Sequence, residues 1–210
     1  MLMSPGARKF ALTAHVLSSI GWFGALLVFL AHTVVSLVSG NVQVVRSVCF
    51  AMALTAWLVI LPLSLASLIT GVVQALGTAW GLIRHYWVVA KLALTTFATA
   101  ILLLKLAPIG QLSDAAAQVS FSASDSTDLK MSLLVHSVGG LVVLLAISVL
   151  AVYKPAGMTR FALRRAPTPD GKAPDLRAPP WVRVALWVAG ACALAIALLA
   201  LHGGHGPSMH

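Results

Sequence analysis

Hydrophobic residues in this chain form long runs that no Lys, Arg, Asp or Glu interrupts. The runs cover residues 10–45, 47–83, 131–153 and 184–210. Because a membrane-spanning helix needs about 20 apolar residues, the pattern predicts five spans, near residues 11–38, 48–76, 86–107, 130–153 and 182–202. We therefore expect an all-α fold, a polytopic transmembrane helical bundle with a four-helix core and a fifth, accessory span.

Breaks in the apolar pattern divide the chain into four units. Residues 1–155 form the predicted four-helix core, and residues 156–181 form a basic, proline-rich linker. The fifth span covers residues 182–202, and residues 203–210 form a tail that contains His and Met. Within the core, Pro62 should remove one helical hydrogen bond and kink the second span. Residues 108–130 are expected to form an outer loop with one helical turn at residues 115–118.

Composition and charge place the chain in a membrane. It is 60% hydrophobic and only 9% charged, whereas a soluble domain carries about 25% charged residues. Ten of the 14 basic residues fall on the side of the N-terminus: Arg8, Lys9, Arg84, Lys154, Arg160, Arg164, Arg165, Lys172, Arg177 and Arg183. This asymmetry predicts a multi-pass protein of the bacterial inner (cytoplasmic) membrane, with the N-terminus cytoplasmic and the C-terminus outside. Contact with anionic lipid accounts for the net charge of +9, and nucleic-acid binding is excluded.

Four histidines, His15, His32, His85 and His136, lie at or inside the apolar runs. Titratable side chains are costly in hydrocarbon and usually serve a function there. At a rise of about 1.5 Å per residue, His32 and His136 both lie roughly 9 Å from the outer surface, on different helices. Two imidazoles facing each other across a bundle are the ligand set of a b-type haem. The alternative is that each histidine only bonds a neighbouring hydroxyl or carbonyl and joins two helices.

A second group of polar residues is expected at the inner ends of the first and third spans. His15 belongs to the first span, and His85 and Lys91 belong to the third. His15 and His85 are candidates for a second haem-ligand pair, so that one or two haems are expected, and Lys91 is a candidate partner of a haem propionate. The alternatives are that Lys91 extends its ammonium to the interface and that His85 anchors the helix at the headgroups.

Two segments resemble known membrane families. The segment from His15 to Gly24, with Trp22 between them, resembles the first helix of HemJ-type protoporphyrinogen oxidases and of CopD-type copper-resistance proteins. The segment from Arg84 to Leu92 resembles their Trp-x-x-x-Lys-Leu signature, here Trp87 to Leu92. Over residues 10–160 the chain also resembles a bacterial family of predicted integral membrane proteins of unknown function.

The resemblance implies a cofactor and two site residues. HemJ-type proteins bind haem b and oxidise a porphyrinogen, and their motif residues correspond to His15 and Lys91 of this chain. His32, His136, the fifth span and the tail lie outside that pattern, so the resemblance favours haem binding more than porphyrinogen oxidation. Whether this chain turns over a substrate is left open.

The tail supplies a weaker candidate metal site. His202, His205, Met209 and His210 are a ligand set suited to copper, and the alternative is a flexible end with incidental affinity. Cys49 and Cys192 lack metal-ligand spacing and are expected to be packing residues.

Three functions follow from these observations. The first and favoured one is a haem b-binding membrane redox protein with a quinone or respiratory-chain partner. The second is a CopD-like copper-handling protein, and the third is a haem-free accessory subunit of a membrane complex. A homo-oligomer is left open.

Overall fold

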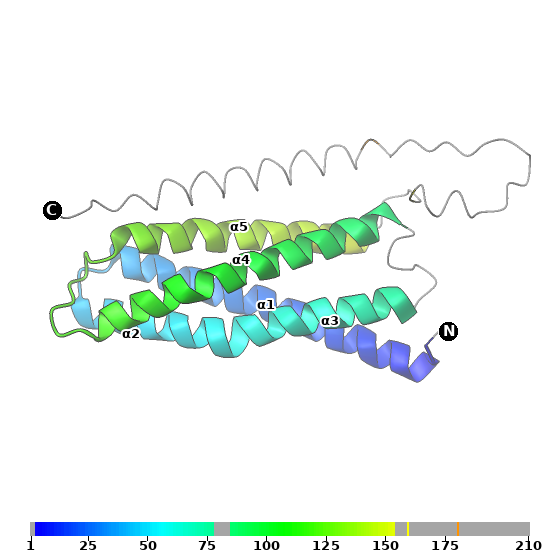
Figure 1. Cartoon of the computed structure of the whole chain (residues 1–210), viewed down its shortest axis with the longest axis horizontal. Coiled ribbons are helices and arrows are strands. Elements are labelled where there is room, and N and C mark those ends of the chain that lie inside the picture. Colours follow the sequence, from blue (N-terminus) through cyan, green and yellow to red (C-terminus); the bar gives the residue numbers. More distant parts are fainter. Residues whose placement is uncertain (1–2, 78–84, 154–158, 160–179, 181–210) are drawn as a thin grey trace, which may run out of the picture.

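The computed structural model describes residues 3–77 and 85–153, together with residues 159 and 180. These residues form four long helical spans (Figure 1). The bounds are α1, Pro5–Val38; α2, Val42–Thr55, followed by the π-helix η1, Ala56–Ile60, and α3, Leu61–Gly77; α4, Tyr86–Ala117; and α5, Thr127–Tyr153. Each span is long and apolar enough to cross a membrane, which confirms the four-helix core. The fifth span expected at 182–202, the linker and the tail lie outside the described residues.

The spans run alternately in opposite directions, so the bundle has two distinct ends (Figure 1). At the end called here the N-terminal end lie the start of α1, the end of α3, the start of α4 and the end of α5. The opposite end, called the loop end, carries the connections at 39–41 and 118–126. Asn41 caps α2, because its Oδ1 accepts hydrogen bonds from the backbone N–H groups of Gln43 and Val44 at 2.9 and 3.3 Å.

The second span contains a π-helical segment, η1, close to Pro62, where the sequence predicts a kink. Leu61 N–H donates to Ala56 O, five residues back, directly before Pro62. Proline lacks an N–H and its ring clashes with the carbonyl four residues earlier, and a π-turn accommodates both effects. A buried stripe passes through the segment without interruption: Val45, Cys49, Met52, Ala56 and Ile60 are each at most 1% exposed. Cys49 is a packing residue, as the sequence indicates.

The expected end of the third span at residue 107 is wrong, because α4 continues through Pro108 to Ala117. The added turns bury Ile109, Leu112 and Ala116, each at most 3% exposed, on one face of the helix. Their spacing of three and four residues directs them at the core, and this packing outweighs the cost of the proline. The helical turn expected at 115–118 is the end of this same helix. The outer loop is therefore shorter than the predicted one.

The surface and the interior of the bundle divide as a membrane protein requires. Large apolar side chains such as Phe10, Leu58 and Leu104 are 69–77% exposed, and we assign this surface to contact with the lipid bilayer. Inside, small hydroxyl residues such as Thr33 and Ser64 are fully buried and donate to backbone carbonyls of their own helix. Small residues with internally satisfied hydroxyls allow helices to approach closely in lipid.

Candidate functional site

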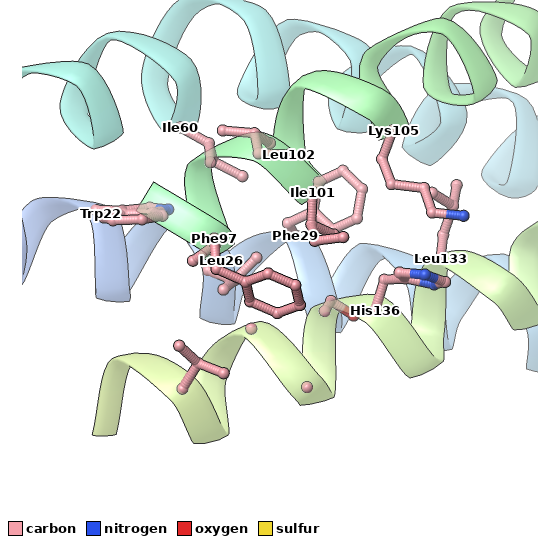
Figure 2. Close-up of a pocket in the computed structure, with 15 residues that line it drawn as sticks. Trp22, Leu26, Phe29, Ile60, Phe97, Ile101, Leu102, Lys105, Leu133 and His136 are labelled. Carbon is pink, nitrogen blue, oxygen red and sulfur yellow. The ribbon is translucent and has the colours of Figure 1, made fainter. Parts of the chain in front are cut away.

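A cavity, called here the larger cavity, lies among α1, η1, α4 and α5 of the described bundle, and its lining is almost entirely apolar (Figure 2). Its volume is about 70 Å³. The lining residues are Trp22, Leu26, Phe29, Ile60, Phe97, Ala98, Ile101, Leu102, Lys105, Leu133, His136, Ser137, Gly139, Gly140 and Val143. Only two of them, Lys105 and His136, are titratable.

His136 is held in one tautomer by its own helix. Its Nδ1 lies 2.6 Å from the carbonyl oxygen of Ser132. A carbonyl only accepts hydrogen bonds, so Nδ1 carries the proton and Nε2 keeps its lone pair. Histidines that bind metals almost always donate their other ring N–H to a carbonyl or carboxylate in this way. His136 therefore has the protonation of a metal ligand, on a residue that lines the cavity.

Lys105 reaches the same part of the cavity from α4, and sequence analysis did not identify it. Its Nζ donates to Ser132 Oγ at 3.3 Å, so that Lys105 and His136 both form hydrogen bonds to Ser132. Figure 2 shows the two side chains at the same end of the cavity. Lys105 was not considered as a cavity residue because the third span was expected to end at residue 107, which placed Lys105 at the membrane surface. In the structure it lies 12 residues before the end of α4 at Ala117, which is about 18 Å of helix.

Two adjacent glycines contribute differently to the wall that α5 provides. A Cβ added at Gly140 would lie 3.0 Å from Leu26 Cδ2, so this glycine allows α1 and α5 to approach closely. A Cβ added at Gly139 would meet nothing within 4 Å. Both glycines line the cavity, so the backbone of α5 is bare over part of it. A flat ligand can approach a helix most closely over such a stretch.

A smaller and more polar cavity of about 40 Å³ contains His15 and Lys91. His15 Nδ1 lies 3.0 Å from Ser67 O and 3.1 Å from Thr70 Oγ1, both on α3. The ring also packs over Gly71, where an added Cβ would lie 3.2 Å from His15 Cε1. The structure thus brings His15 and Lys91 to one cavity, and it joins α1 to α3 through His15.

Trp22 separates the two cavities, because it lines both of them. Its side chain is only 3% exposed. The sequence marked this residue only as part of the first resemblance motif. In the structure it is the shared wall between a His–Lys pair on one side, His15 and Lys91, and a second pair on the other, His136 and Lys105.

His32 is not among the residues that line the cavity of His136. Gly21 and His32 are eleven residues apart and share nearly one face of α1, and at Gly21 that face packs on Leu63 of α3. The side of α1 that meets α5 carries Leu26, from which His32 is turned by about 120°. The Nδ1 atom of His32 is buried and has no hydrogen-bond partner among the described residues.

His85 lies at the N-terminus of α4, where its side chain makes no capping hydrogen bond to the helix. Its ring is 6.5 Å from that of Trp87, and it lines neither cavity. Within residues 3–77 and 85–153, no group of three or more His, Cys, Asp or Glu side chains is placed to hold a metal ion. The candidate copper ligands His202, His205, Met209 and His210 lie outside the described residues.

The larger cavity fits the donor chemistry of haem b. It offers one imidazole with a free Nε2, a bare stretch of helix, and otherwise apolar walls, and a single histidine is sufficient to hold haem iron. The cavity volume of about 70 Å³ is well below the roughly 300–1,000 Å³ of common ligand pockets. A porphyrin ring therefore fits only if the helices that line the cavity move apart.

Comparison with known proteins assigns nothing further. No family model matches the chain, and neither a curated protein nor a solved structure matches it.

Proposed function

We propose that this chain is a haem b-binding integral membrane redox protein in which His136 would hold the haem iron. The observation that carries the proposal is the hydrogen bond from His136 Nδ1 to Ser132 O at 2.6 Å, which leaves Nε2 free beside an apolar cavity. Haem b supplies one-electron chemistry between ferric and ferrous iron. Its usual partners in a membrane are a quinone or a respiratory-chain protein. The resemblance to HemJ-type proteins supports the choice of cofactor but not its place, because the corresponding residues His15 and Lys91 line the smaller cavity.

Each of the surrounding residues has a part in this proposal. His136 binds and orients the cofactor, and its bond to Ser132 fixes the ring. Trp22 and Phe29, both at most 4% exposed, close the cavity on the side of α1 and exclude water. His32 would need a rotation of α1 to serve as the opposing ligand, so the proposal does not give it that role.

A difference spectrum tests the proposal directly. Purified wild-type protein should show a reduced-minus-oxidised haem b spectrum, and His136→Ala should abolish it. His32→Ala is the matched control. It removes an imidazole that does not line the cavity, so the spectrum should remain intact. Loss of pigment in His32→Ala with retention in His136→Ala would refute the assignment.

One observation favours the second candidate, a haem-free accessory subunit. His15 makes the kind of interhelical hydrogen bond that this function expects, because it joins α1 to Ser67 and Thr70 of α3. Pigment-free protein that binds no added haemin, and that loses stability on His15→Ala, would favour this candidate.

A further inference from the structure

The lysine in the larger cavity has no acidic counter-charge among the described residues around it. The lining includes neither Asp nor Glu, and the hydrogen bond from Lys105 Nζ to Ser132 Oγ is 3.3 Å long. Lys105 makes no ion pair with a carboxylate of the described residues: Asp114 lies nine positions further along α4, and Asp125 Oδ2 accepts a hydrogen bond from the backbone N–H of Ser122. An ammonium group at such a position is costly unless it is paired.

The side chain of Lys105 is directed into the bundle. It lines the cavity, and its ammonium donates to Ser132 Oγ of α5. Figure 2 shows Lys105 at the same end of the cavity as His136. The remaining walls of the cavity near it are aliphatic and aromatic, including Phe29, Ile101 and Leu133. A positive charge beside a free imidazole, in apolar surroundings, is a recognition site for an apolar ligand that carries an acid group.

We infer that Lys105 is the counter-charge for a carboxylate of the ligand that His136 holds, so that the cavity selects a porphyrin with free propionates. This inference rests on the proposed function and deepens it. His136 would hold the iron through Nε2, and Lys105 would donate to a propionate oxygen, so that the propionate takes the place of the missing acidic side chain. Charge-assisted hydrogen bonds are stronger than neutral ones, so a ligand without the acid should bind more weakly.

The test compares haemin with its dimethyl ester, in which both propionates are masked and the ring is unchanged. Haem-depleted full-length protein in detergent micelles is titrated with each compound and followed by absorbance. Wild-type protein should bind haemin at least about tenfold more tightly than the ester, as expected for one hydrogen bond to a charged group. Lys105→Met should remove that preference while still binding the ester, and Lys105→Arg, which keeps the charge, should retain it.

The competing assignment is tested in the same helix. Lys91, in the smaller cavity, is the other candidate partner of a propionate, so Lys91→Met should leave the preference for haemin unchanged if Lys105 holds the acid group and should abolish it if Lys91 does. Equal affinity of wild-type protein for haemin and the ester would overturn the inference and leave the proposed function standing. A preference that survives in Lys105→Met, or that disappears in Lys91→Met, would also overturn it. Failure of the wild-type protein to bind either compound would refute the proposed function itself, and the inference with it.

Discussion

Adding a methyl group to each of two neighbouring glycines of α5 tests how the wall of the larger cavity is built. A Cβ at Gly139 would meet nothing within 4 Å, whereas a Cβ at Gly140 would lie 3.0 Å from Leu26 Cδ2. Both residues lie inside the helix Thr127–Tyr153, so each change to alanine should gain about 0.5–1 kcal/mol from reduced backbone freedom. Gly140→Ala carries in addition the cost of overpacking, which is about 1–3 kcal/mol in well-packed sites.

The comparison of the two variants isolates the contact with Leu26, because the backbone gain is common to both. Gly139→Ala should be slightly more stable than wild type, and Gly140→Ala should be less stable than Gly139→Ala by about 1–3 kcal/mol. Leu26 is only 9% exposed and lines the cavity, so it can yield only by moving into that space. The strain thus acts on the cavity directly.

The free energies of unfolding of the two haem-free variants are measured in detergent micelles, by denaturant titration followed by far-ultraviolet circular dichroism. Haem-free protein is used so that ligand binding does not contribute to stability. The reasoning would be refuted if the two variants agreed within about 0.5 kcal/mol, which is the usual limit for independent effects. It would equally fail if Gly139→Ala were the less stable of the two.

Three further predictions concern other parts of the chain. Gly71→Ala should push the His15 ring off its hydrogen bond to α3 and lower the unfolding free energy by about 1 kcal/mol, measured in the same titration; an unchanged value would contradict the contact. Removal of residues 203–210 should abolish copper binding in equilibrium dialysis without altering any haem spectrum, and copper binding that persists would exclude the tail as the site. In a cysteine-free background, Ser124→Cys should react with a membrane-impermeant thiol reagent added to intact cells, and Ser4→Cys only after permeabilisation; the reverse pattern would invert the proposed orientation.

The helices were largely predictable from the sequence, because long apolar runs have few structural solutions in a membrane. The ends of the helices were less predictable. The third span was expected to stop before Pro108, yet burial of Leu112 and Ala116 at 0% exposure carries α4 on to Ala117. A local rule about proline could not anticipate that packing, and the same error concealed Lys105.

The candidate site was predictable only in part, because the depth of a residue along its helix says nothing about how the helix is rotated about its axis. Counting residues placed His32 and His136 at similar heights, and they do lie on neighbouring helices. Height along a helix does not determine the direction of a side chain, and α1 turns His32 away from the face that meets α5. By contrast, His15 and Lys91 line one cavity, as their common position at the inner ends of two spans suggested. The hydrogen bond that fixes His136 goes to a backbone carbonyl, which every residue type provides, so no residue of the sequence signalled it.

The amount of haem b per polypeptide tests the central claim most directly. Protein purified from haem-replete cells, assayed as its pyridine haemochrome, should contain a single haem b per chain, and His136→Ala protein prepared in parallel should contain none. Wild-type protein that is folded and colourless, and that stays colourless after incubation with haemin, would contradict the account.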